Sequence, residues 1–294
     1  MKRKKNLLVN NYEINTNEKL KKAASKYGAE VYPKIRLADV VDIENSGLDS
    51  KEYKYALQAH FDFVVTKGKE LSPEFVIEFD EESHGKYETC IKNDKLKNSI
   101  CKKFEISLFR IKADFLREVG KFPKINNRSI FTGEFNSLAG WLVECWFLEK
   151  AFYEEQEKGF IPYDEPFCWF SFLGHDPFAQ SRLYLQKMYK KKLCTTFIPK
   201  QIKGHDSDEI AWATLAILQL YNGKYIYGSA ECKSINFTAI SAYDLCEELA
   251  ILDLTKKLFA YETSDFLINL TKQEIEKKEE EFRKKYIIPK FLEQ

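Results

Sequence analysis

The stretch FVIEFD at residues 75–80 decides how the first part of the chain folds, because it places two acids in an otherwise apolar strand. Side chains alternate along a β-strand, so Glu78 and Asp80 share one face of it. The stretch HFDFVV at residues 60–65 likewise holds one acid, Asp62, among apolar residues. A carboxylate in a buried strand needs a partner, which is a metal, another cation or several hydrogen bonds.

Three acids on neighbouring strands, Asp62, Glu78 and Asp80, repel one another, and a divalent cation relieves that repulsion. All-oxygen ligands favour Mg²⁺ or Mn²⁺ over zinc. Because of the same repulsion, we expect that replacing one of these acids leaves the metal-free fold unharmed. Two other interpretations stay open. Asp62 is a strand-end acid paired with a lysine, or Glu78 and Asp80 form buried salt bridges.

The elements around these strands form a mixed α/β unit of single-domain size. Hydrophobic spacing and turn residues predict the order helix, three strands, helix, strand. Their expected bounds are 17–27, 31–41, 60–66, 74–80, 88–104 and 107–111. The composition changes near residue 120, so we expect a basic tail at 1–11, an α/β domain at 12–120 and a second domain at 121–294.

Four motifs in this order resemble those of a bacterial domain family of unassigned function with an IELDxxSH…DxxK…LLRI pattern. The motifs here are HFDFVV at 60–65, FVIEFDEESH at 75–84, NDKLKN at 93–98 and ISLFRI at 106–111. That family belongs to the PD-(D/E)XK nuclease superfamily, which includes restriction endonucleases and short-patch repair (Vsr-like) endonucleases. The resemblance covers about residues 12–115. It implies a restriction-endonuclease-like core, which is a mixed central sheet flanked by helices.

The resemblance also implies roles for individual residues. Asp62 and Glu78 would hold Mg²⁺ or Mn²⁺, with Asp80 as a further metal ligand. The common signature of the superfamily has a lysine where this chain has Asp80, and Lys97 on the following helix is our choice for its replacement. Glu18 matches an auxiliary acid of some relatives, although it lies opposite the apolar face of its predicted helix.

Three further residues are candidate substrate contacts. His84 follows the third strand at a turn, where a lone histidine is more often a satisfied loop residue. Lys92 and Lys95 lie on the predicted helix at 88–104, where they form a solvated face or contact phosphates.

The second part of the chain is rich in aromatic residues and is predicted to be mostly helical within an α+β domain. Helices are expected around 138–152, 208–220, 242–258 and 271–286. We expect this domain to recognise substrate, to form a homodimer or to bind a partner of a defence system.

A rival site lies in this second part. Residues 225–230 are a strand candidate, and the following Glu231-Cys232-Lys233 fits the E-x-K signature by spelling alone. Its companion acid would be Asp206, Asp208 or Glu209, but the helix-like stretch at 211–221 separates them from that strand. A match of three residues is common by chance.

Composition excludes several classes of protein. The chain has 294 residues, with 46 basic and 45 acidic ones, so bulk positive charge does not drive binding to a polyanion. Seven cysteines without a C-x-x-C pair argue against a disulfide framework or a zinc site. No apolar run reaches the roughly 20 residues of a membrane span, and no secretory signal is found, so we expect a cytoplasmic protein without a membrane partner.

These observations together predict a metal-dependent nuclease that hydrolyses phosphodiester bonds. An endonuclease is favoured, with DNA as the favoured substrate and a role in restriction, phage defence or DNA repair implied by the resemblance. The alternative is a catalytically inactive module that retains the nuclease fold for nucleic-acid binding or assembly, and the Asp80 departure supports it.

Overall fold

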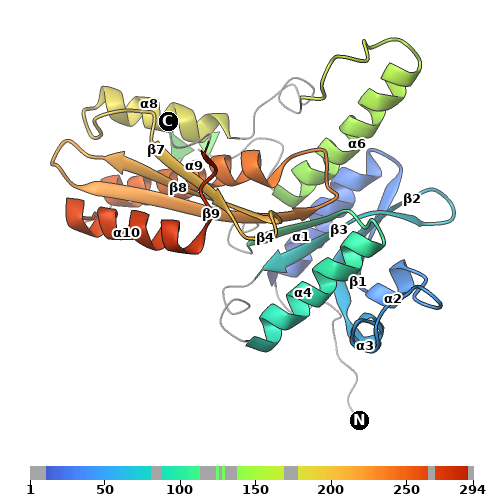
Figure 1. Cartoon of the computed structure of the whole chain (residues 1–294). Helices are drawn as coiled ribbons and strands as arrows, with labels where there is room; N and C mark the ends of the chain where they lie inside the picture. The colour runs from blue at the N-terminus through green and yellow to red at the C-terminus, as the bar shows by residue number, and fades with distance from the viewer. Residues whose placement is uncertain are drawn as a thin grey trace. The chain divides into compact units, whose positions relative to one another are not determined.

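The computed structural model describes residues 11–80, 88–112, 124–125, 128–129, 138–168, 178–263 and 269–290 (Figure 1). The chain divides into two compact units. Unit 1 comprises Met1–Glu118, Phe135–Gly174 and Ser234–Ile240, and unit 2 comprises Val119–Glu134, His175–Lys233 and Ser241–Gln294. The expected boundary near residue 120 is therefore too simple, since unit 1 also takes in two later segments of the chain.

Unit 1 contains four neighbouring strands in the order β1 (Ala29–Arg36), β2 (His60–Lys67), β3 (Ser72–Asp80) and β4 (Leu108–Lys112). The β1–β2 and β2–β3 pairs are antiparallel, and β3 and β4 are parallel. A parallel pair needs a crossover, which α4 (Glu88–Lys103) provides between β3 and β4. The expectation of a mixed α/β unit is confirmed.

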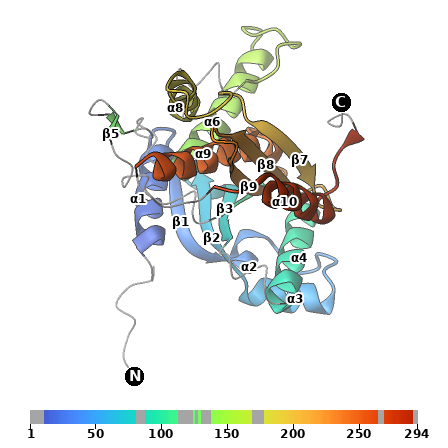
Figure 2. The same cartoon turned by 90° about the vertical axis from the view of Figure 1, so that its left-hand side faces the viewer.

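Helices cover both faces of these strands. Figure 2 shows α1 (Asn11–Ser25) on one side, and α3 (Ser50–Gln58) and α4 on the other. α1 packs against β1 and α6 (Leu138–Glu157), while α3 packs against α4. A short helix, α2 (Leu37–Val40), follows β1, so this strand ends earlier than the predicted residue 41.

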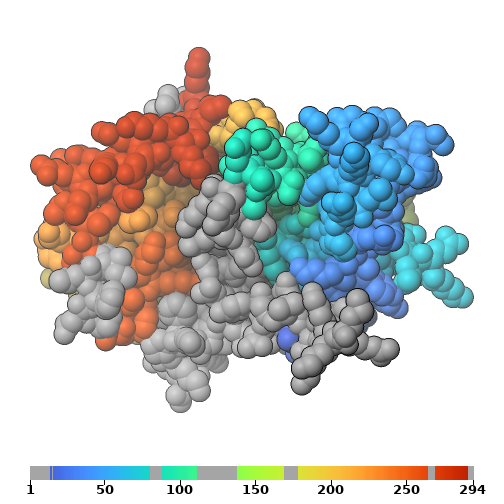
Figure 3. Space-filling model, turned by 90° about the horizontal axis from the view of Figure 1, so that it is seen from below, coloured from blue at the N-terminus to red at the C-terminus, as the bar shows by residue number. Residues whose placement is uncertain are grey.

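The sequence reading missed α3, although its start is encoded. The Asp49 side chain accepts hydrogen bonds from the backbone N–H groups of Lys51 and Glu52, and the Glu52 carboxylate accepts one from the backbone N–H of Asp49, which forms a capping box. The buried Glu52 carboxylate also accepts hydrogen bonds from two residues of α4, from Ser99 Oγ at 2.9 Å and from Lys103 Nζ at 2.6 Å. In Figure 3 the teal surface of α4 accordingly adjoins the blue surface of α3.

An aromatic cluster explains why unit 1 takes in later segments. Phe237 packs against Phe75 of β3, Phe109 of β4 and Trp146 of α6, with ring centroids 5.1–5.3 Å apart. Trp146 also donates to Glu74, at the start of β3, at 3.0 Å. Residues from four distant parts of the sequence thus build one core.

Unit 2 is built on an antiparallel meander of β7 (Lys200–His205), β8 (Ala211–Gln219) and β9 (Tyr225–Ile235), whose last two residues belong to unit 1. α9 (Ala242–Thr263) packs on β8 and β7, and α8 (Ala179–Lys190) packs on α9. The other face receives Ile275 and Phe282 of α10 (Lys272–Lys285). Two two-residue strands, β5 (Lys124–Ile125) and β6 (Arg128–Ser129), form a separate pair.

The helix expected at 208–220 is wrong, because Ala211–Gln219 forms strand β8. Nearly every residue of this stretch is buried, since α9 covers one face of the strand and α10 the other. A strand buried on both faces loses its alternation, so periodicity cannot distinguish it from a buried helix. The second part of the chain thus holds a three-stranded meander that was not expected, beside the helices α6, α8, α9 and α10. Within the described residues no helix is long and apolar enough to cross a membrane.

Two glycines that pack on helices test this architecture. A Cβ at Gly228 of β9 would overlap the backbone of Ala250 and Leu254 in α9, whereas a Cβ at Gly140 of α6 would lie 3.6 Å from its nearest neighbours. We expect Gly228→Ala to lower the free energy of unfolding by at least about 3 kcal/mol. Gly140→Ala should raise it by up to about 1 kcal/mol, since alanine favours helix. Equal effects in chemical denaturation would contradict the packing of α9 on β9.

Candidate functional site

The two acids singled out from the strands lie side by side in unit 1. The backbone N–H of Asp62 donates to Glu78 Oε1 at 3.2 Å, and the backbone N–H of Phe79 donates to Asp62 Oδ2 at 2.8 Å. Each carboxylate is thus fixed by the backbone of the neighbouring strand. Asp80 ends β3, but its side chain lies outside the described part of the chain.

Glu78 is buried and paired with the lysine chosen from the sequence. Lys97 Nζ lies 2.7 Å from Glu78 Oε2 and donates a second hydrogen bond to the carbonyl of His60 at 2.8 Å. Both side chains are less than one tenth exposed. Burial raises the pKa of Glu78, the positive charge of Lys97 opposes this, and the charge of Asp62 adds to it.

A second cation on the same face comes from β4. Arg110 lies opposite Glu78 in the parallel β3–β4 register, and its side chain is 1% exposed. Its Nη1 donates to Asp94 Oδ1 of α4 at 2.7 Å. Close by on α3, burial and then the charge of Glu78 raise the pKa of Tyr55. Two ion pairs, Lys97–Glu78 and Asp94–Arg110, therefore hold α4 against this face of the sheet.

Asp62 lies at the open side of the site. Lys34 Nζ of β1 lies 2.6 Å from Asp62 Oδ1, and the two side chains are 38% and 19% exposed. The pair Asp62–Lys34 is more accessible to water than the pair Glu78–Lys97, whose side chains are 9% and 8% exposed.

Among the side chains that the structure describes on this face, the charges balance without a metal. Three carboxylates face three cations, and each carboxylate has a cation within 2.7 Å; the pairs are Asp62 with Lys34, Glu78 with Lys97, and Asp94 with Arg110. For Glu78 this pairing replaces the expectation that removing an acid leaves the fold unharmed. Its loss would leave the buried ammonium of Lys97 unpaired.

The residues present fit Mg²⁺ or Mn²⁺ on the condition that Lys34 releases Asp62. Two adjacent carboxylates supply the oxygen ligands that Mg²⁺ takes from a protein, with water and phosphate completing the shell. Asp62 is the more exposed of the two carboxylates, and Lys34 holds its Oδ1. The described residues contain no group of three or more histidine, cysteine, aspartate or glutamate side chains that could hold a metal. A metal at this site would thus rest on Asp62 and Glu78.

The remaining predicted residues that the structure describes do not join this cluster. Glu18 is exposed on α1, which covers the opposite face of the sheet (Figure 2). Lys92 pairs with Glu88 at 2.7 Å on the surface of α4, and Lys95 is exposed there too. His84 lies outside the described residues. The sequence reading missed Lys34, Asp94 and Arg110, although NDKLKN and ISLFRI contain the last two.

The rival E-x-K residues are engaged with the C-terminal segment of unit 2. Glu231 accepts hydrogen bonds from Tyr286 and from Lys285 Nζ, the latter at 2.9 Å, and Lys233 Nζ lies 3.6 Å away. Burial alone would raise the pKa of Glu231, but these partners outweigh it and hold the pKa at about 2. Asp206 instead closes a turn by accepting the backbone N–H groups of Ile210 and Ala211.

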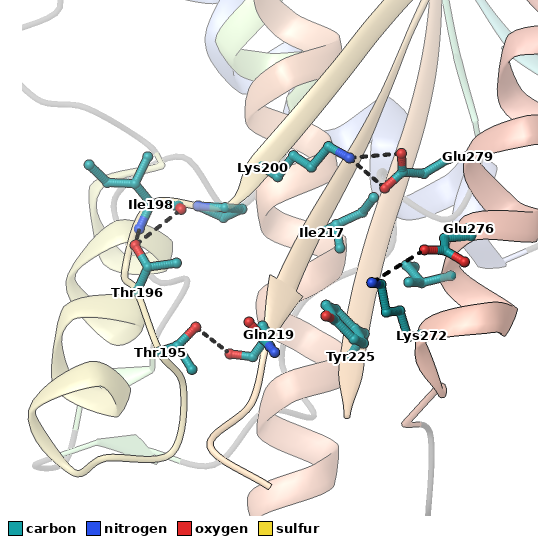
Figure 4. Close-up of a pocket in the computed structure, with 12 residues that line it drawn as sticks. Thr195, Thr196, Ile198, Lys200, Ile217, Gln219, Tyr225, Lys272, Glu276 and Glu279 are labelled. Atoms are coloured by element: carbon teal, nitrogen blue, oxygen red, sulfur yellow. Dashed lines mark hydrogen bonds and ion pairs between the residues drawn. The ribbon is translucent and has the colours of Figure 1, made fainter. Parts of the chain in front are cut away.

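Unit 2 also has an open hollow of about 510 Å³ between the ends of β8 and β9, the segment 195–199 and α10 (Figure 4). Its charged groups pair with each other. Lys200 meets Glu279 at 2.7 Å, and Lys272 meets Glu276 at 3.8 Å. Because these charges are matched within the wall, the hollow offers no surplus charge to a ligand.

Comparison with known families gives a match over the first part of the chain. Residues 5–122 match the family model described as "Protein of unknown function (DUF2726)". This match covers the part of the chain that holds β1 to β4, α4 and the charged cluster. No curated protein and no solved structure matches the chain.

The buried ion pair makes a sharp stability prediction. Glu78→Ala should lower the free energy of unfolding by about 3–5 kcal/mol, because it leaves Lys97 buried and unpaired. The double variant Glu78→Leu/Lys97→Met removes both charges at similar volume, and it should come within about 1 kcal/mol of the wild type. Urea unfolding of both variants checks this. A Glu78→Ala protein as stable as the wild type would refute the pairing.

Glu231 makes a prediction about pH. Its pKa is lower in the folded protein than its ordinary value of 4.5. Its ionised form therefore stabilises the fold at pH values above 4.5, and this contribution is lost as pH falls towards about 2. The free energy of unfolding of the wild type should exceed that of Glu231→Gln by about 3 kcal/mol at pH 6. This difference should shrink as pH falls from 4.5 towards about 2. A difference that does not change from pH 6 to pH 2.5 would contradict it.

Proposed function

We propose that unit 1 is a metal-dependent nuclease that hydrolyses phosphodiester bonds, an endonuclease with DNA as the favoured substrate. The observation that carries the proposal is the position of Lys97. It reaches from α4 to within 2.7 Å of Glu78, beside Asp62 on the adjacent strand. Two acids on neighbouring strands and a lysine at the second acid form the constellation expected from the nuclease resemblance, even though Asp80 stands in the usual position of the lysine.

Each residue has a distinct task in this proposal. A bound Mg²⁺ would polarise the scissile phosphate and lower the pKa of a water molecule. Asp62 presents a partly exposed carboxylate, and Glu78 provides a rigid buried one. An ammonium group has three N–H donors. Lys97 donates two of these N–H groups to His60 and Glu78. In this proposal the third N–H orients water or stabilises charge on a phosphate oxygen.

The biological setting is proposed from the resemblance alone. The protein would act in the cytoplasm of a bacterium in restriction, phage defence or DNA repair. Unit 2 would recognise substrate, form a homodimer or bind a partner protein.

One observation favours a second function. The cluster is electrically balanced without a metal, as a purely structural ion-pair network would be. A catalytically inactive module for nucleic-acid binding or assembly would need no more than this. The two functions differ in whether a divalent cation binds and whether nucleic acid is cut.

Cleavage assays separate these functions. We expect Mg²⁺- or Mn²⁺-dependent cutting in a panel of linear, circular and single-stranded DNA and RNA. Asp62→Asn should abolish it. Lys97→Gln should slow the single-turnover rate by about 10²–10³, as the loss of other preorganised donors does. Lys95→Ala is the matched control on the same helix and should lose only affinity and salt dependence.

Three outcomes would count against the nuclease. Binding without cutting of any substrate would favour the inactive module. An Asp62→Asn protein that cuts at the wild-type rate would remove the site. Lys233→Ala abolishing cutting while Lys97→Gln leaves it intact would move the centre to unit 2. Circular dichroism must show each variant folded.

A further inference from the structure

We propose that Lys34 is a resident cation of this site, which holds Asp62 in the metal-free protein and gives way when a divalent metal binds. The inference rests on the proposed function, since it concerns how the same site takes up its metal. It adds a residue that neither the motifs nor the family match singles out.

The position of Lys34 is specific. The pairs Pro33–Phe63 and Ile35–Phe61 flank it in the β1–β2 register, so Lys34 stands opposite Asp62 across the strands. Its backbone has a φ of 56°, in the left-handed region that costs a non-glycine residue energy. Among the described non-glycine residues with positive φ, Lys34 alone lies inside a strand. Such outliers cluster at functional sites, where the surrounding structure holds them in place.

Charge explains why a metal must compete with Lys34. Asp62 and Glu78 carry two negative charges, and Lys34 and Lys97 carry two positive ones at 2.6 and 2.7 Å. A divalent cation at Asp62 therefore meets an ammonium group only a few ångströms away, among described side chains whose charges already cancel. Like charges at that separation repel strongly where water is partly excluded.

Exposure shows which of the two lysines yields. Lys97 is buried, and breaking its pair with Glu78 would leave a charge unmatched away from water. The Lys34 side chain is 38% exposed, so water can hydrate its ammonium when the pair with Asp62 breaks. The metal thus replaces Lys34, while Lys97 remains to act on the phosphate.

The test is direct binding of Mn²⁺, measured from the electron paramagnetic resonance signal of free Mn²⁺ at fixed ionic strength and without nucleic acid. Lys34→Ala and Lys34→Gln should bind Mn²⁺ roughly threefold to tenfold more tightly than the wild type, because the competing ion pair is gone. Lys34→Arg keeps the charge and should stay within about twofold. Lys54→Ala, an exposed lysine of α3, is the matched control and should not change the affinity.

The outcomes separate this inference from the proposed function. Unchanged or weaker Mn²⁺ binding by Lys34→Ala and Lys34→Gln would overturn the role of Lys34, while loss of binding in Asp62→Asn would leave the metal site standing. If no Mn²⁺ binding depends on Asp62 in any variant, both proposals fail. Should Lys34→Ala not fold, the comparison of Lys34→Gln with Lys34→Arg decides the question alone.

Discussion

A carboxylate buried in the middle of a sheet has to be neutralised, and the pairing of Glu78 with Lys97 is how this protein does it. The lysine comes from α4, so the charge pair also fixes that helix on the sheet. Asp94 and Arg110 repeat the arrangement one strand further along, and Glu52 joins α4 to α3. The helices of this face are thus held to the sheet and to each other by buried or half-buried charges as well as by apolar contact.

A gradient of exposure crosses the same cluster. Glu78 and Lys97 are shielded from water, whereas Asp62 and Lys34 reach the surface. A rigid, buried ion pair beside an exposed, exchangeable one suits the proposed site, which must hold one lysine in place and still admit a metal and a phosphate. The proposed displacement of Lys34 would account for an ion pair at a residue with a strained backbone.

The sequence was sufficient for the elements whose pattern is local. Strands β2, β3 and β4 and helix α4 lie close to their predicted bounds, and Lys97 could be chosen because it borders the apolar stripe of its helix. Lys34 could not be found in this way, since its role depends on a cross-strand register that no local pattern encodes. The role of Phe237 could not be predicted for a similar reason, because its core partners Phe75, Phe109 and Trp146 lie far earlier in the sequence. Strand β8 could not be predicted because burial on both faces removes its periodicity.

The central claim is that Asp62 and Glu78 form a metal site from which Lys34 is displaced. A crystal structure of the full chain soaked in Mn²⁺, with anomalous differences recorded, tests it most directly. The account predicts one strong peak bound by oxygens of Asp62 and Glu78, with Lys34 Nζ beyond hydrogen-bonding distance of Asp62 and Lys97 still on Glu78. An empty site at saturating Mn²⁺, with the Lys34–Asp62 pair intact, would contradict it.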